Sequence, residues 1–360
     1  MTVPTPSANL AAAPRAPETL PGDGDEERSD FDPYRPFRTA LLTPERIRQL
    51  SELRPWRAVA DTLWLWLQIL GAWTFVAIWP AWWAALLAIP LIGARYYALL
   101  IVGHDAIHRR LFRSRRMNDN FADLFIFGPV LAVTRINNQN HLGHHRHLAT
   151  PEDPDLHQFT CANKYSWRSF LGYLSGATSA WRSFRNVFVR RGASDPAADK
   201  PRESAPGREG YAWRDLAVIG AWQVALIGGL TWGVAWWAYP ALWLAPLYCF
   251  AFLGDNLRAF AEHSQPEPEP EADAHRLITF VSNPLERLFI APLNMNFHAA
   301  HHLWPSIPYY NLAQADREIR ALPAARELEW RGAYCGYLWR YFRLLPLEDC
   351  RQPRGAGATS

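Results

Sequence analysis

The stretches TLWLWLQILGAWTFVAIW (residues 62–79) and AWWAALLAIPLIGARYYALLIV (residues 81–102) decide the fold of this chain. A helix needs roughly 20 mostly apolar residues to cross the hydrocarbon core of a bilayer, and each stretch comes close to that length. Pro80 separates them, and a proline cannot continue a helix without breaking a backbone hydrogen bond. We therefore expect two membrane-spanning helices that form a hairpin.

A second pair of apolar stretches repeats this arrangement at residues 215–238 and 241–257, with Pro240 between them. Neither turn carries a charged residue, and both are rich in aromatic residues. Tryptophan and tyrosine favour the level of the lipid headgroups, where their rings meet both lipid and water. The aromatic residues at the two turns are Trp79, Trp82, Trp83, Trp236, Trp237, Tyr239 and Trp243.

The segments at the opposite ends of these helices are rich in arginine, which by the positive-inside rule lies on the cytosolic side. The arginines are Arg109, Arg110, Arg113, Arg115, Arg116, Arg146, Arg182, Arg185, Arg190 and Arg191. We therefore predict an all-α integral membrane protein with four transmembrane helices in two hairpins, a helical cap on the cytosolic side and both termini in the cytosol. The alternative is a soluble helical protein in which these helices are buried.

The two ends of the chain differ in composition from its middle. Residues 1–36 are rich in proline, alanine and acidic residues and lack the apolar core of a signal peptide, so we expect a disordered cytosolic tail. The membrane domain is expected at residues 37–345, and a flexible tail at residues 346–360. The net charge of +3 does not suggest a nucleic-acid-binding protein. The four cysteines form no CxxC pair and are expected to be reduced.

Nine of the twelve histidines fall into four tight groups. Spacings of three and four residues place side chains on one face of a helix, so the rings of a group can point into one volume. Neutral imidazole is the commonest metal ligand in proteins, and nine rings exceed what one tetrahedral site can use. The pattern predicts a site for two metal ions with open positions. The predicted ligands, which would also be the catalytic residues, are His104, His108, His141, His144, His145, His263, His298, His301 and His302.

The predicted topology agrees with this site. Two histidine groups precede the second hairpin and two follow it, and a hairpin returns the chain to the side from which it left. All nine rings would therefore lie on the cytosolic side of the membrane, where they can form a single site.

Acidic residues near the histidines are candidates to support them. A metal-binding histidine usually donates its second ring N–H to a carboxylate or a carbonyl, which fixes the orientation of the ring. Asp105 is adjacent to His104, Glu262 is adjacent to His263, and Asp155 follows the second group. Simple solvation, or pairing within a helix such as that of Arg258 with Glu262, is the alternative for these carboxylates.

These motifs resemble those of the membrane fatty acid desaturase and hydroxylase superfamily. GHDAIH (residues 103–108), HLGHHRH (141–147) with EDPDL after it, and NFHAAHHLWPSIPYYNL (296–312) look like its three histidine boxes. RAFAEH (258–263) looks like the helix end that carries an additional ligand. Some members have an asparagine four residues before that histidine, where this chain has Ala259. Asn294, four residues before His298, is an alternative candidate near the second metal.

The resemblance implies a non-haem diiron centre that uses O2 and two electrons to break unactivated C–H bonds. We expect a fatty acid desaturase that acts on a lipid or acyl chain. A lipid hydroxylase or ketolase, and a fatty-acid decarboxylase that forms a terminal alkene, are alternatives on the same scaffold. A metal transporter and a membrane zinc hydrolase belong to other classes; the spans offer few polar groups for an ion path, and HExxH is absent.

Electrons must come from another protein, because the chain has no haem motif, no CxxC pair for a rubredoxin-type iron and no GxGxxG fingerprint. A separate ferredoxin, rubredoxin or cytochrome with its reductase is implied, and the arginine-rich side would suit an acidic carrier. We expect a multi-pass protein of a bacterial inner membrane with its active site on the cytosolic face.

Overall fold

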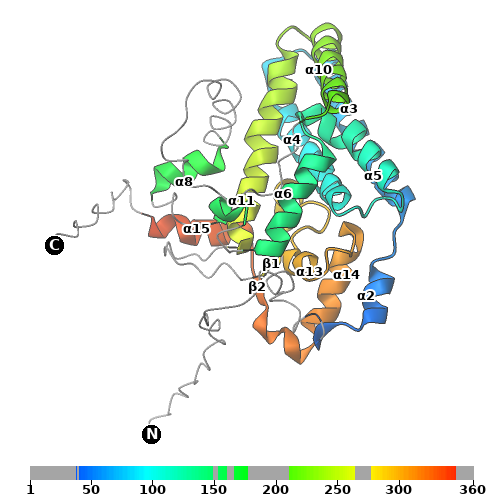
Figure 1. Cartoon of the computed structure of the whole chain (residues 1–360). Coiled ribbons are helices and arrows are strands. Elements are labelled where there is room, and N and C mark those ends of the chain that lie inside the picture. The colour runs from blue at the N-terminus through cyan, green and yellow to red at the C-terminus, as the bar shows by residue number, and fades with distance from the viewer. Residues whose placement is uncertain are drawn as a thin grey trace, which may run out of the picture.

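The structure is a computed structural model of the chain, and it describes residues 38, 40–148, 153–159, 166–176, 211–263 and 277–345. These residues are mostly helical (Figure 1). The predicted tails at residues 1–36 and 346–360 lie outside the described residues. Three of the described helices are long and apolar enough to cross a membrane, namely α3 (Pro55–Ile78), α4 (Trp82–Ile107) and α10 (Trp213–Gly233).

Helices α3 and α4 form the predicted first hairpin. Helix α3 buries Thr62, Leu65, Ile69 and Val76, whose spacing of three, four and seven residues defines one helical face. Helix α4 is the more deeply buried of the two and continues past the apolar stretch to Ile107. This extension places His104 near the C-terminal end of α4, one of the helices long and apolar enough to span a membrane.

The fourth predicted span does not form one regular α-helix. It consists of the π-helical segments η6 (Pro240–Leu244) and η7 (Leu247–Ala251), which lead directly into α11 (Phe252–His263). Ala245 and Pro246, between the two π-segments, also have helical dihedral angles. The chain therefore remains helical from Pro240 to His263, and this run carries His263 at its end.

Helix α4 lies very close to this run. A Cβ atom added to Gly93 would lie 2.7 Å from the carbonyl oxygen of Pro246, closer than real Cβ atoms approach backbone atoms. Only glycine therefore fits at this crossing. The close approach holds the ends of α4 and α11, with their histidines, beside one another.

Side chains from α3, α4 and α10 form hydrogen bonds with the irregular segment that follows α5 (Arg115–Ala122). This segment consists of the π-turn η2 (Asp123–Phe127) and the 3₁₀-turn η3 (Gly128–Val130). The Trp222 indole donates to the Leu124 carbonyl at 2.6 Å, and the Trp66 indole donates to the Phe125 carbonyl at 2.8 Å. The Tyr96 hydroxyl donates to the next carbonyl, that of Ile126. Irregular backbone leaves carbonyl groups without helical partners, and these aromatic donors supply partners for three of them.

The remaining helical elements are shorter, and two of them, α13 and α14, lie far from the tip of α10 (Figure 1). They are α2 (Pro44–Leu50), α6 (Thr134–His147), α7 (Leu156–Phe159), α8 (Trp167–Leu174), α12 (Pro284–Phe289), α13 (His298–Leu303), α14 (Tyr309–Arg320), η8 (Pro323–Glu327) and α15 (Tyr334–Leu344). The prediction of an all-α chain needs one correction. The short strands β1 (Ile278–Phe280) and β2 (Glu329–Arg331) pair in parallel, with Thr279 opposite Trp330.

Candidate metal centre

The structure brings all nine predicted histidines together. They come from four segments: the C-terminal end of α4, helix α6, the last residue of α11, and helix α13. Two adjacent clusters result. The first, the five-histidine cluster, comprises His104, His108, His141, His145 and His301, whose ligand nitrogens all lie within 4.8 Å of one another.

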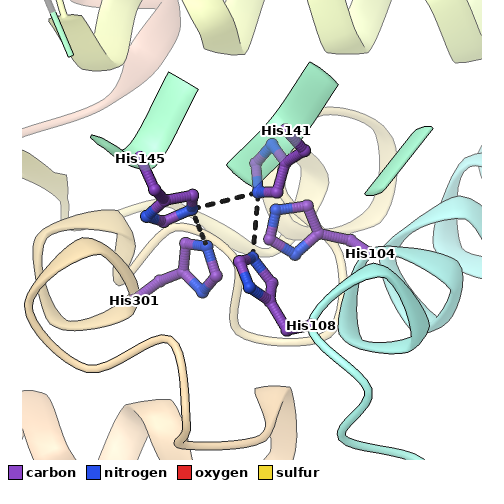
Figure 2. Close-up of side chains that lie close together, drawn as sticks. All are labelled: His104, His108, His141, His145 and His301. Carbon is purple, nitrogen blue, oxygen red and sulfur yellow. Dashed lines mark hydrogen bonds between the residues drawn. The ribbon is translucent and has the colours of Figure 1, made fainter. Parts of the chain in front are cut away.

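Figure 2 shows the rings of the five-histidine cluster converging from α4, α6 and α13 on one point. The Nε2 atom of His141 lies 2.9 Å from that of His108 and 3.0 Å from that of His145. The Nε2 atom of His145 lies 3.1 Å from that of His301. Four nitrogens thus follow one another at nearly equal separations.

The second cluster, here the four-histidine cluster, is more deeply buried. The ligand nitrogens of His144, His263 and His302 lie within 4.8 Å of one another. His298 joins them, because its Nε2 atom lies 2.9 Å from that of His263 and its ring centroid lies 4.4 Å from that of His302. The two clusters meet where the rings of His145 and His302 stack at a centroid distance of 4.2 Å.

These nitrogens fit a pair of metal ions. An imidazole nitrogen binds a divalent transition metal at about 2.1 Å, so neighbouring nitrogens around one octahedral ion lie about 3 Å apart. The separations of 2.9 to 3.1 Å match this value. The Nε2 atom of His302 is buried and has no hydrogen-bond partner among the described residues, as expected of a nitrogen reserved for a metal. The donor set is imidazole alone, which suits iron, zinc, copper and nickel alike.

The electrostatics of the clusters also suit metal binding. Burial lowers the pKa of His108 to about 3, and the neighbouring Arg110 adds to the shift. Burial likewise holds the pKa values of His141, His145, His298, His301 and His302 well below their usual range, with neighbouring histidines adding to the effect. These six rings are therefore neutral at physiological pH, which is the form that binds a metal.

Asp153 supports the four-histidine cluster, and the sequence interpretation missed it. Its carboxylate oxygens lie 3.0 and 3.1 Å from Nδ1 of His144, and both side chains are buried. The contact turns the other ring nitrogen, Nε2, toward the cluster. The signal was present in the EDPDL stretch, but the predicted residue there was Asp155, which contacts Gln158 through its carboxylate.

Glu262 lies against the four-histidine cluster as well. Its Oε2 atom is 3.1 Å from Nδ1 of His298, rather than beside its sequence neighbour His263. Its Oε1 atom accepts hydrogen bonds from Arg258 at 2.8 Å and from the Tyr334 hydroxyl at 2.6 Å.

The other two predicted supporting residues contact the backbone at the start of α14. The Asp105 carboxylate accepts a hydrogen bond from the Tyr309 N–H at 2.9 Å. The Asn294 side-chain amide donates to the Tyr309 carbonyl at 3.3 Å, and Asn294 has a positive φ of 66°. Both residues therefore hold the start of α14 against segments that carry cluster histidines, because Asp105 adjoins His104 and Asn294 precedes α13.

A cavity of about 370 Å³ adjoins both clusters. His104 and His141 of the first cluster line it, as do His144, His263 and His298 of the second. A small organic molecule in this cavity would therefore lie directly against the metal-binding groups.

Comparisons with known proteins agree with this geometry. The sequence profile of the fatty acid desaturase family matches residues 80–334, a segment that holds every histidine of the two clusters. The dihydrorhizobitoxine desaturase of Bradyrhizobium elkanii is 27% identical over 78% of this chain and 81% of its own length. The ferredoxin-dependent sn-1 acyl-lipid omega-3 desaturase of Nostoc sp. (strain 36) is 21% identical over 63% of this chain and 65% of its own length.

A ceramide hydroxylase of Caulobacter vibrioides is also similar, at 32% identity over 33% of this chain and 35% of its own length. The relatives of this chain thus include both desaturases and a hydroxylase. The family match covers well over half of the 360 residues. This chain belongs to the fatty acid desaturase family.

Proposed function

We propose that this protein is a membrane-bound, O2-dependent diiron oxidase that desaturates a fatty acyl or other lipid chain. The observation that carries the proposal is the division of nine buried or half-buried imidazoles into two adjacent clusters beside one cavity. Two irons held there would supply the two-electron activation of O2 that cleaves a C–H bond. All nine histidines are proposed as ligands, and they are the residues that we expect catalysis to require.

The chain's own residues have three tasks in this reaction. The cavity positions one methylene pair of the substrate against the clusters and excludes water. Asp153 and Glu262 hold the rings of His144 and His298 in place. For desaturation, a –CH2–CH2– unit, O2, two electrons and two protons give –CH=CH– and two water molecules.

Hydroxylation is the second candidate, and the similarity to a ceramide hydroxylase favours it. In that reaction a C–H bond, O2, two electrons and two protons give C–OH and one water molecule. The two reactions share the first C–H cleavage and differ in whether a second hydrogen or an oxygen is transferred afterwards.

The two electrons are proposed to come from a separate ferredoxin-type protein. Two relatives are ferredoxin-dependent by name. Arg113, Arg115 and Arg116 are exposed near the inner end of α4, where an acidic carrier could dock. The run from Pro240 to His263 is proposed as the fourth span, which places the clusters on the cytosolic face of a bacterial inner membrane.

Expression in a bacterial host of known lipid content, followed by mass spectrometry of lipids and volatile products, tests the proposal. We expect a new product that has lost two hydrogens and about two irons per purified chain. An added oxygen would identify a hydroxylase, and loss of CO2 would identify an alkene-forming decarboxylase. Tightly bound zinc without iron would instead favour a hydrolase.

Histidine variants make this test specific to the clusters. His301→Ala and His144→Ala each remove a ring from a different cluster and should abolish the product. His147→Ala lies in the same helix as His144 but outside both clusters, and it should retain the product. Undiminished product from His301→Ala or His144→Ala would contradict the ligand assignment.

A further inference from the structure

Among the described residues that line the cavity beside the histidine clusters, only Tyr97 on α4 carries a hydroxyl group. Tyr97 precedes the cluster ligand His104 by seven residues, and Leu100 and Ile101, which lie between them, also line the cavity. These spacings of three, four and seven residues place the four side chains on one face of α4. Only 1% of the Tyr97 surface is exposed. A buried hydroxyl thus shares an apolar wall of the cavity with a metal-binding ring.

Helix α11 holds the Tyr97 ring in place. A Cβ atom added to Gly254 would lie 2.9 Å from Cε1 of this ring, so glycine makes room for it. One turn later, Nη1 of Arg258 donates a hydrogen bond to the Tyr97 hydroxyl oxygen at 3.0 Å. Arg258 is itself fixed by Glu262, whose Oε1 atom accepts a hydrogen bond from its Nε at 2.8 Å. The position of the hydroxyl oxygen is therefore set before any ligand enters the cavity.

The proton of this hydroxyl has no acceptor among the described residues. A tyrosine hydroxyl both accepts and donates hydrogen bonds, and Arg258 occupies only its accepting side. Of the two carboxylates of α11, that of Glu262 accepts from Arg258 and Tyr334, and that of Asp255 makes no hydrogen bond with Tyr97. Leaving a buried donor unpaired is unfavourable, and such groups are nearly always paired in folded proteins. An acceptor inside the cavity would complete the bonding of this hydroxyl.

We propose that Tyr97 is a specificity-determining residue, which donates a hydrogen bond to a carbonyl or hydroxyl oxygen of the lipid substrate. Oxygen atoms of this kind are good acceptors for a phenol O–H group. The hydrogen bond that Arg258 donates polarises the hydroxyl and strengthens the bond that the hydroxyl donates in turn. The inference rests on the proposed function, because it concerns the substrate of that reaction.

The size of the cavity also constrains which carbon is oxidised. Its volume of about 370 Å³ lies near the lower end of the range of roughly 300–1,000 Å³ for small-molecule sites, so it holds only a short part of a long chain. The oxygen that binds Tyr97 and the C–H bond that faces His104 or His298 both belong to this short part. The oxidised carbon is therefore separated from the oxygen by only a few carbons, rather than by half the length of an acyl chain.

The test compares two ligands that differ only in the acceptor. Methyl butyl ketone carries a carbonyl oxygen, and in its methylidene analogue a CH2 group replaces that oxygen. Their affinities for the iron-loaded, full-length protein in nanodiscs are measured by titration calorimetry, with protein-free nanodiscs as the correction for partitioning into lipid. Tyr97→Phe keeps the ring and removes the hydroxyl. We expect this variant to lower the ratio of ketone affinity to alkene affinity about fivefold, which corresponds to the loss of one hydrogen bond.

Tyr96→Phe is the matched control, because it removes a hydroxyl from the neighbouring residue of α4. The Tyr96 hydroxyl donates to the Ile126 carbonyl, and Tyr96 does not line the cavity. This variant should leave the affinity ratio unchanged, whatever its effect on stability. Difference infrared spectroscopy adds a readout that a purely structural role would not move. The carbonyl stretch of the bound ketone should lie at lower frequency in the wild type and in Tyr96→Phe than in Tyr97→Phe.

An equal affinity ratio in Tyr97→Phe and the wild type would overturn the proposal, as would a carbonyl stretch that is identical in the two proteins. A loss of bound iron in Tyr97→Phe would also overturn it, because the hydroxyl would then serve the metal centre through Arg258 and Glu262. An iron-loaded protein that desaturates a lipid far from its nearest oxygen would refute this inference alone. Failure of the wild type to bind iron would refute the proposed function itself.

Discussion

Each of the two HxxHH motifs contributes two rings to one cluster and one ring to the other, and the cluster that receives two differs between the motifs. In α6, His141 and His145 face the five-histidine cluster and His144 faces the other. In α13, His298 and His302 face the four-histidine cluster and His301 faces the other. In each motif the last two histidines are adjacent in sequence and so lie about 100° apart around the helix, which lets one ring reach each cluster. Removing either helix would therefore open both metal sites.

At this scale the spacing of the histidines predicted that their rings would gather, because helical periodicity is a local property. It did not predict which ring joins which cluster, since that depends on how α4, α6, α11 and α13 cross. The supporting residue Asp153 was missed for a related reason. It lies nine residues after His144 and beyond the end of α6, a separation that no helical spacing describes.

Asp153→Asn tests the role of this carboxylate. An amide cannot orient His144 as a carboxylate does, so we expect metal affinity to fall by about 10- to 100-fold. Iron content after dialysis against a graded series of chelator concentrations measures the change. Asp119→Asn, outside the clusters and the cavity, is the control. Iron retention by Asp153→Asn equal to that of the control would show that Asp153 is dispensable.

At the scale of elements, the close packing of α4 against η7 positions the helix ends that carry the ligands. The second turn lies at residues 234–237, ahead of Pro240, which begins η6. Hydropathy and Pro80 predicted the first turn, because loss of the apolar run is a strong local signal. They did not predict the helix ends. Helix α3 begins at Pro55, before the apolar stretch, and α10 ends at Gly233 rather than at residue 238. Hydropathy marks the part of a helix in lipid, whereas its ends depend on packing.

The pairing of β1 with β2, about fifty residues apart, has no local signal in the sequence.

Gly93→Ala tests the helix crossing. Its new methyl group would meet the Pro246 carbonyl oxygen at 2.7 Å, and neither backbone can move easily. We expect a loss of about 1–3 kcal/mol in the free energy of unfolding, as for other overpacked sites. Unfolding in detergent, followed by tryptophan fluorescence, measures it.

Gly71→Ala provides a matched comparison in α3, because nothing lies within 4 Å of its added Cβ. Alanine has the higher helix propensity, so this variant should be as stable as the wild type or slightly more stable. Equal stabilities for the Gly93 and Gly71 variants would mean that the crossing tolerates a wider separation.

At the scale of the whole molecule, the four membrane crossings that we propose are an even number, which would allow a single metal centre to form. Three helices meet the length and hydropathy of a span, and the helical run from Pro240 to His263 is the proposed fourth. The histidines before and after the second hairpin meet in space, which requires the chain to return to the side it left.

Reporter fusions test this topology. Alkaline phosphatase, active only in the periplasm, should be active when fused after Pro80 or after Ala235. Green fluorescent protein should fluoresce when fused after Leu53, Tyr211 or Leu345. A phosphatase that is active at Leu345 would indicate an odd number of crossings.

The buried imidazoles also predict how stability depends on pH in the metal-free protein. An unfolded histidine takes up a proton near pH 6.5, whereas burial lowers the pKa of His108 to about 3 and lowers those of other cluster members too. Between these values the unfolded state binds more protons, so stability is present above about pH 6.5 and is lost as pH falls. Thermal unfolding of iron-free protein from pH 8 to pH 4 measures this. A midpoint that is constant below pH 6.5 would contradict the neutral state of the rings.

The order of the ligands along the chain has a consequence for biogenesis. Each cluster takes at least one ring from α13, and α13 begins at residue 298 of 360. A ribosome must therefore complete most of the polypeptide, and both proposed hairpins must enter the lipid, before either of the two irons that we propose would have its full set of partners. Maturation is then a post-insertional event, and the newly made apoprotein must wait in the membrane with its imidazoles already assembled to receive the metal.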